Sequence, residues 1–392
     1  MGKGFKIGSI FGIDIRIDWS WLFIFVLVTW NLAFVFGEYH SDWGTVLRWS
    51  TAIMAALLFF ASVLAHEISH SLVARAQGLP VRSITLFLFG GVASIEREPT
   101  SPRNEFLMAL VGPLTSFVIG FILLLVAGAI AGPVLGAMTN PEQVLGGLSP
   151  LATLLMWVGS VNIFVGIFNL LPGFPLDGGR IVRSIFWAIT DNLRRATRWA
   201  SGIGSFIAWM MIIGGIAMVF GVSIPFFGSG IGGLWLAFIG WFLNSAATQG
   251  YQQVVVQDIL EGVTVSRMMR SEPPTVSTQV PVSSLVSDYV MGSDDHAFPV
   301  MDDERLTGIV TLEDIRKAPK DTWDRTRVGE IMTPGEDLEV VGPDDDASEA
   351  LNKLGRRDVR QLPVVSEGRL VGLLRRRDII RWLQLHSELD MG

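Results

Sequence analysis

Two histidines and a glutamate stand at metal-binding spacing inside an apolar stretch of the chain, in the sequence His66-Glu67-Ile68-Ser69-His70. On a helix, residues four apart lie on the same face, so both imidazoles can bind one metal ion. Glu67 then lies close enough to take a proton from a metal-bound water. This pattern also arises by chance on soluble helices, but ionisable side chains at membrane depth are costly and usually functional. The spacing therefore predicts a zinc site with Glu67 as general base.

A zinc site of this kind needs a third protein ligand, and the acidic candidate is Asp177, in the sequence NLLPGFPLDGGR at residues 169–180. Its two prolines and three glycines end the preceding apolar helix and give an irregular turn, which can hold a carboxylate that faces inward. Taken alone, an Asp-Gly pair is most often an ordinary turn. The membrane topology, however, puts Asp177 on the same side and at a similar depth as His66 and His70. We therefore expect the three side chains to bind one zinc ion per chain.

The composition is that of a membrane protein. Half of the 392 residues are hydrophobic and 17% are charged, whereas a soluble protein has ~25% charged residues. Six stretches approach or meet the ~20 apolar residues that a membrane-spanning helix needs: 19–36, 51–74, 107–131, 151–171, 204–220 and 226–243. Lysine and arginine gather in alternate connecting segments, which favours the cytoplasmic side for those segments. We therefore expect a multi-pass protein with a cytoplasmic N-terminus and a cytoplasmic C-terminal region, in a prokaryotic cell membrane.

Composition also excludes several kinds of chemistry. Cysteine is absent, so disulfides, cysteine-bound metals and thiol nucleophiles are excluded. The formal net charge of -7 argues against a nucleic-acid partner, because phosphate binding requires clustered basic residues. The N-terminus has no early apolar core followed by a small-residue cleavage site, so we expect no removable signal peptide.

Residues 81–96 (VRSITLFLFGGVASIE), between the second and third spans, are rich in β-branched side chains and are interrupted by Gly90 and Gly91. This pattern predicts two short strands that meet at the glycines. Open strand edges are not tolerated facing lipid, so the strands must lie against protein, a water-filled cavity or the membrane surface. They form either a packed interfacial hairpin or an edge that pairs with an extended substrate peptide.

The HExxH motif in one span and the NxxPxxPxDG motif at the end of a later one together resemble the site-2 protease family of intramembrane metalloproteases, over residues 5–241. The resemblance implies these roles: zinc binding for His66, His70 and Asp177, catalytic base for Glu67, substrate or oxyanion contact for Asn169, and substrate pairing for Gly90 and Gly91. The implied substrate is a membrane-spanning or membrane-associated protein. The family often has an asparagine shortly after a Gly-Pro pair in the third span, whereas this chain has GPLTS at residues 112–116.

The C-terminal region contains an internal repeat. VSRMM at residues 265–269 recurs as VGEIM at 328–332, and FPVMDDERLTGIVTLEDI at 298–315 recurs as LPVVSEGRLVGLLRRRDI at 362–379. Each copy has the pattern strand, amphipathic helix, strand, turn, strand, helix, so two copies form one α/β unit. Both copies resemble CBS modules, which commonly pair.

The resemblance to CBS modules implies a regulatory ligand and a partner. Adenine nucleotides are often held by a motif of the form G-h-x-[TS]-x-x-D, which is complete in the first copy at Thr311 and Asp314. The second copy keeps Asp378, a further nucleotide-binding candidate, but has Arg375 in place of the hydroxyl residue, and the arginines at 375–377 either meet phosphates or form a solvated helix start. We expect ATP or another adenine nucleotide as regulator, with a dimerisation domain without ligand as the alternative. Symmetric pairing of such modules predicts a homodimer.

Together these patterns predict a polytopic α-helical membrane domain with a small sheet, followed by a soluble α/β tandem CBS domain. The expected divisions are 1–248 for the membrane metalloprotease, 249–262 for a linker, and 263–320 and 325–386 for the two CBS modules. A CBS-regulated ion channel or transporter is the alternative, in which the intramembrane charged residues would line an ion path. No convincing repeat between the first three and the last three spans supports that alternative.

Overall fold

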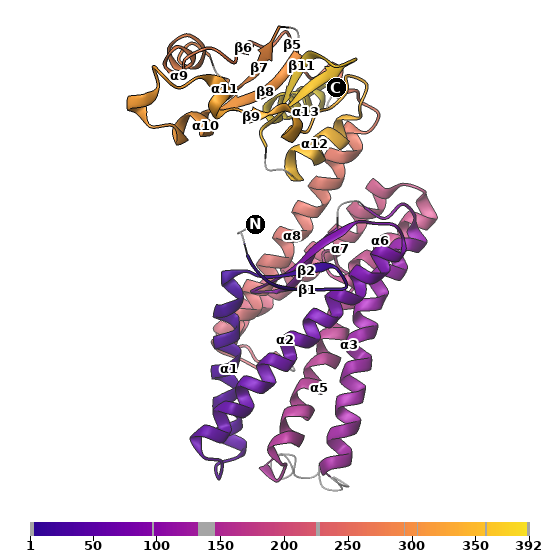
Figure 1. Ribbon diagram of the computed structural model, residues 1–392. Helices are drawn as coiled ribbons and strands as arrows, with labels where there is room; N and C mark the ends of the chain where they lie inside the picture. The colour runs from indigo at the N-terminus through magenta and orange to yellow at the C-terminus, as the bar shows by residue number, and fades with distance from the viewer. Residues whose placement is uncertain are drawn as a thin grey trace. The chain divides into compact units, whose positions relative to one another are not determined.

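The computed structural model describes residues 4–95, 98–131, 146–224, 228–293, 295–303, 305–356 and 359–389. The chain divides into two compact units, Met1–Gln252 and Gln253–Gly392. The first unit contains the long apolar helices and the second contains both copies of the sequence repeat (Figure 1).

Five of the described helices are long and apolar enough to cross a membrane: α1 (Trp19–Tyr39), α2 (Thr45–Ala76), α3 (Pro102–Ala131), α5 (Pro150–Asn169) and α7 (Leu193–Val219). They cover the first five predicted spans. The sixth predicted span, 226–243, begins on residues outside those described, and α8 (Gly232–Leu260) covers its remainder without being one of the five. Large apolar side chains such as Leu125 (73% exposed) and Ile213 (62% exposed) lie on the outer surface of these helices, as lipid-facing groups do. The predicted polytopic membrane fold is confirmed.

A four-stranded sheet lies beside these helices, in the order β1-β2-β3-β4. The predicted strands between the second and third spans are β3 (Val81–Phe87) and β4 (Gly90–Ile95), which pair antiparallel. An N-terminal hairpin, β1 (Phe5–Ile10) and β2 (Ile13–Ile17), was not predicted, and its second strand runs parallel to β3. Figure 1 shows β1 and β2 crossing the helices near the C-terminal half of α2. Because β4 pairs only with β3, its outer edge is unpaired within the described sheet.

The segment that carries Asp177 differs from the predicted irregular turn in one respect. The turn spans residues 170–176, and Asp177 is then the first residue of an additional short amphipathic helix, α6 (Asp177–Thr190). The α6 helix packs between α3 and α7. The sequence did not reveal this helix because its glycines follow two prolines, a composition typical of loops.

The second unit contains two similar α/β halves, as the repeat predicted. One sheet has the order β6-β7-β8-β9 and the other has the order β10-β11-β5. The strands are β5 (Arg270–Ser271), β6 (Val276–Ser277), β7 (Ala297–Asp302), β8 (Arg305–Thr311), β9 (Thr333–Pro334), β10 (Gln361–Ser366) and β11 (Arg369–Arg375). The helices are α9 (Val282–Ser284), α10 (Leu312–Lys317), α11 (Val328–Ile331), α12 (Ala347–Arg356) and α13 (Arg376–Leu389), and the shorter helical turns are η1 (Val265–Arg267), η2 (Leu285–Val290), η3 (Lys320–Thr322) and η4 (Gly335–Asp337).

The two halves of the second unit exchange a short strand. Strand β5 belongs to the first copy in sequence but pairs with β11 of the second copy. Strand β9 belongs to the second copy but pairs with β8 of the first. A buried cluster of Ala297, Ile309 and Leu373 joins the two sheets. The halves therefore form one domain rather than two independent ones.

Candidate metal centre

The structure brings His66, His70 and Asp177 together, although Asp177 is more than a hundred residues from either histidine in sequence. His66 Nε2 and His70 Nε2 are 3.2 Å apart, and each lies 3.2 Å from Asp177 Oδ2. Both histidines are buried, with exposures of 5% and 6%. Three ligand atoms of the predicted types thus form a nearly equilateral triangle inside the helix bundle.

This triangle fits a zinc ion. Tetrahedral zinc with ligand distances of ~2.0–2.1 Å places neighbouring ligand atoms ~3.3 Å apart. The observed spacing of 3.2 Å is close to that value. Two imidazoles and one carboxylate are also a ligand set that zinc favours in catalytic sites, with a fourth position left for water or substrate.

Each histidine is oriented by a hydrogen bond at its other ring nitrogen. His70 Nδ1 donates to the Met108 carbonyl oxygen at 2.6 Å, which leaves Nε2 unprotonated and able to bind a metal. His66 Nδ1 lies 2.9 Å from the Ser116 hydroxyl. Ser116 is the last residue of the GPLTS stretch, where this chain departs from the pattern of the site-2 proteases. Helix α3 therefore orients both imidazoles of α2.

Helix α6, which begins with Asp177, is fixed to α3 by a buried ion pair. Arg183 is 2% exposed and Glu105 is fully buried, and Arg183 Nε donates to Glu105 Oε1 at 2.6 Å. Arg183 also contacts Glu98, at 3.0 Å, and lies over the Phe174 ring at 5.4 Å. Burial by itself would lower the pKa of Arg183, but the two glutamates outweigh it and raise that pKa above its usual value. Sequence reasoning missed this pair, because Glu105 and Arg183 lie 78 residues apart in the chain.

Two glycines bring other backbone segments close to the site. A Cβ atom added at Gly112 of α3 would lie 2.5 Å from His70 Cε1 and 2.7 Å from His66 Nε2. A Cβ atom added at Gly91 of β4 would lie 3.0 Å from Glu67 Cδ. The backbones of α3 and β4 thus approach the ligands and Glu67 more closely than any other residue type would allow. The predicted strand near Gly91 therefore runs directly beside Glu67.

Comparisons with known proteins agree with this arrangement. Residues 54–213 match peptidase family M50, and residues 265–321 and 328–385 each match the CBS domain. The Rip3 protein of Mycobacterium tuberculosis is 33% identical over 388 residues, which cover 98% of this chain and 94% of Rip3. The sll0528 protein of Synechocystis is 34% identical over 387 residues, which cover 98% of this chain and 96% of sll0528. The names of both relatives describe them, as a provisional assignment, as zinc metalloproteases. The chain belongs to peptidase family M50, the site-2 proteases.

Two further relatives come from Methanocaldococcus jannaschii. The zinc metalloprotease MJ0392 is 28% identical over 336 residues, which cover 85% of this chain and 86% of MJ0392. A solved structure of a site-2 protease from the same organism is 26% identical, with a TM-score of 0.43, over 63% of this chain and 94% of that one. As an M50 member with a tandem CBS pair, the chain is a zinc metalloprotease. The predicted enzyme class is confirmed, and the channel or transporter alternative is set aside.

Other predicted site residues of this M50 chain have local contacts. The Asn169 amide donates to the Val165 carbonyl within its own helix at 3.0 Å, so a catalytic role for Asn169 stays a prediction. Gly90 begins β4 with a φ of 128°, a conformation that favours glycine. Thr311 and Asp314 form a reciprocal capping box at the start of α10. Asp378, near the start of α13, is bonded to the Arg375 side chain.

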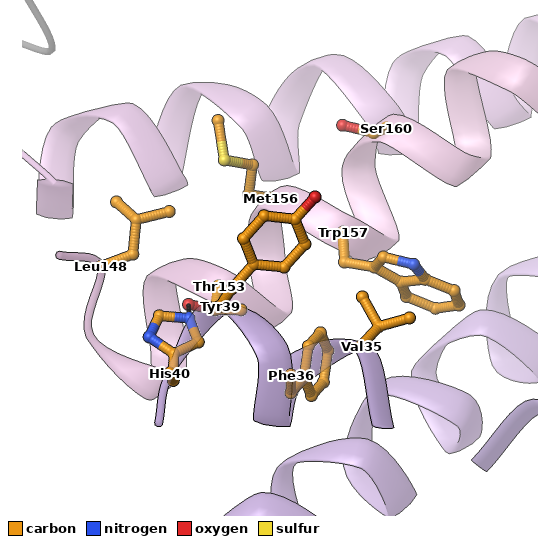
Figure 2. A pocket seen from close by; sticks show the side chains of 9 residues that line it. All are labelled: Val35, Phe36, Tyr39, His40, Leu148, Thr153, Met156, Trp157 and Ser160. Atoms are coloured by element: carbon orange, nitrogen blue, oxygen red, sulfur yellow. Dashed lines mark hydrogen bonds between the residues drawn. The ribbon is translucent and has the colours of Figure 1, made fainter. Parts of the chain in front are cut away.

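A separate cavity of about 250 Å³ lies between the end of α1 and the start of α5. Figure 2 shows its lining, which includes Tyr39, His40, Thr153 and Trp157 and contains none of the three candidate zinc ligands. His40 Nε2 lies 3.1 Å from the Thr153 hydroxyl, and the His40 ring stacks on Trp43 at 3.9 Å. His40 thus has a structural role in joining the end of α1 to α5.

Proposed function

We propose that this protease hydrolyses peptide bonds of membrane-spanning or membrane-associated proteins, in regulated intramembrane proteolysis. The observation that carries the proposal is the His66, His70 and Asp177 triangle, with both histidines on the apolar helix α2 and with Glu67 beside β4, whose outer edge is unpaired within the described sheet. A zinc ion bound there would polarise the scissile carbonyl and lower the pKa of a bound water to ~7. Glu67 would take the proton of that water and pass it to the leaving amine.

The unpaired edge of β4 supplies a means of holding the substrate. A peptide bond within a helix has its carbonyl hydrogen-bonded and hidden, so the substrate helix must unwind locally before cleavage. An extended segment can then add to β4 through main-chain hydrogen bonds. Because Gly91 lies against Glu67, a strand paired there would pass beside the candidate general base. Asn169, at the end of α5, is proposed to assist by contacting the substrate or the developing oxyanion.

The proposed orientation follows from the loop charges. Lysine and arginine in the N-terminal segment and after α2 and α5 favour a cytoplasmic N-terminus and a cytoplasmic CBS pair, in a prokaryotic cell membrane. The metal centre lies in the C-terminal half of α2, at the end that this orientation directs toward the cytoplasm. Water for hydrolysis would then enter from the cytoplasmic side.

Regulation is proposed to act through the CBS pair. Thr311 and Asp314 supply the hydroxyl and carboxylate of the nucleotide motif, at the start of α10. Asp314 Oδ1 contacts only the exposed Lys317, at 3.4 Å, among the described hydrogen bonds and ion pairs. This carboxylate can therefore accept ribose hydroxyls of ATP or another adenine nucleotide. A homodimer through the CBS pair is proposed on the symmetry typical of such modules.

The decisive experiment combines metal analysis with cleavage. In detergent-purified protein we expect about one zinc per chain in the wild type and none in the His66→Ala, His70→Ala double variant or in Asp177→Ala. Glu67→Gln should keep its zinc and its thermal stability but lose cleavage of a membrane-protein substrate in proteoliposomes. Cleavage by Glu67→Gln at the wild-type rate would remove Glu67 from the mechanism, and wild-type protein without zinc would contradict the proposed site.

A further inference from the structure

The two nucleotide motifs of the CBS pair differ in what contacts their aspartate. In the first, Thr311 Oγ1 donates to Asp314 Oδ2 at 2.7 Å and accepts from the Asp314 backbone N–H at 3.2 Å. Among the described residues, this local pairing leaves Asp314 Oδ1 with a single polar contact, to Lys317, whose side chain is 68% exposed. An exposed lysine is easily displaced, because exposed ion pairs contribute little. The first motif can therefore accept a ligand hydroxyl.

In the second motif Arg375 stands where the first has Thr311, and its guanidinium holds both oxygens of Asp378. Arg375 Nε donates to Asp378 Oδ2 at 2.7 Å, and Nη2 donates to Oδ1 at 2.8 Å. The Arg375 backbone N–H adds a third contact to Oδ2 at 3.2 Å. A bidentate arginine–carboxylate pair of this kind is among the strongest hydrogen-bonding arrangements in proteins. Asp378 thus already has a partner at each oxygen that would meet a ribose.

The same guanidinium also joins the two modules. Arg375 Nη1 donates to Asp295 Oδ1 at 2.6 Å, and Asp295 comes from the first module, just before β7. The Asp295 side chain is only 2% exposed and also contacts Arg270 and Arg377, at 2.6 Å and 3.0 Å. The Arg375 guanidinium thus contacts the carboxylates of Asp378 and Asp295 at once. A rotation of the Arg375 side chain that released Asp378 would also break its ion pair with the buried Asp295.

We propose that the Arg375 side chain occupies the second motif and prevents Asp378 from binding a nucleotide. Thr311 and Asp314 then form the only ribose-binding motif among the described residues of the pair. This inference rests on the proposed nucleotide binding at the first motif. It assigns to the second motif a structural role, that of tying the modules together, and it makes the ligand response of the CBS pair asymmetric. The expected stoichiometry is one adenine nucleotide per chain.

The test is equilibrium dialysis of the full-length protein in detergent with labelled ATP. Wild type should bind one ATP per chain. Arg375→Thr gives the second motif the hydroxyl residue that the first motif already has, and this variant should bind one ATP more than wild type. If wild type binds none and Arg375→Thr binds one, the nucleotide proposal for the first motif fails while the proposal that Arg375 blocks the second motif stands. If wild type binds two ATP per chain, or if folded Arg375→Thr binds no more ATP than wild type, the proposal that Arg375 blocks the second motif is overturned.

A second pair of variants keeps the inference testable if Arg375→Thr does not fold. Asp378→Asn should leave both the ATP stoichiometry and the Kd within about twofold of wild type, because Asp378 does not meet the ligand. Asp314→Asn, the matched change in the first motif, should lose at least tenfold in affinity. A tenfold loss in Asp378→Asn would mean that Asp378 contacts ATP and would overturn the proposal that Arg375 blocks the second motif. Melting temperatures of all variants control for loss of fold.

Discussion

Gly112→Ala should abolish zinc binding without unfolding the protein. The new Cβ atom would lie 2.5 Å from His70 Cε1 and 2.7 Å from His66 Nε2, whereas ordinary contacts begin near 3.4 Å. The nearest atom to the new Cβ would be His70 Nε2, so the rings would have to retreat by at least about 0.7–0.9 Å, while zinc sites tolerate ligand displacements of only ~0.2 Å. The rings can rotate because they are side chains, so the backbone of α3 need not move. Zinc should fall from about one per chain to less than a tenth, and peptide cleavage should fall with it.

The assay is metal analysis of detergent-purified protein, beside thermal unfolding and cleavage. Gly128→Ala is the matched control, because it lies in the same helix and an added Cβ atom there meets nothing within 4 Å. The control should keep its zinc and activity. A Gly112→Ala variant that binds zinc as the wild type does would refute the close approach of α3 to the ligands, and a loss of zinc in both variants would point to a general effect on the helix.

Two further predictions concern the groups around the ligands. Arg183→Met should destabilise the protein by about 3 kcal/mol in thermal unfolding, because it removes the hydrogen-bonded partner of the buried Glu105 carboxylate and leaves that carboxylate only Arg180, 3.8 Å away. The double variant Arg183→Met, Glu105→Leu should recover much of that loss, and a double variant as unstable as the single one would contradict the pairing. Gly91→Val should keep zinc but lower cleavage about 10²-fold, because the new side chain displaces Glu67; loss of zinc in Gly91→Val would instead place β4 against the ligands.

The sequence determined much of the candidate site because its signals are local. The HExxH spacing places His66 and His70 on one face of a helix whatever surrounds it. Apolar runs of about 20 residues identify most spans, since the bilayer sets their length. The CBS repeat is visible because two copies preserve the same order of apolar and turn residues. These features follow from periodicity along the chain and need no knowledge of distant contacts.

Only the tertiary structure decided which distant groups complete the site. The Met108 carbonyl and the Ser116 hydroxyl orient the histidines, yet a backbone carbonyl has no sequence signature and a serine in a helix usually has no special role. The N-terminal hairpin gains its stability from pairing with β3, so its own residues gave too weak a signal. The occupation of Asp378 by Arg375 also depends on Asp295, which lies 80 residues away in sequence. Such contacts between segments far apart in the chain arise from packing, which sequence periodicity does not encode.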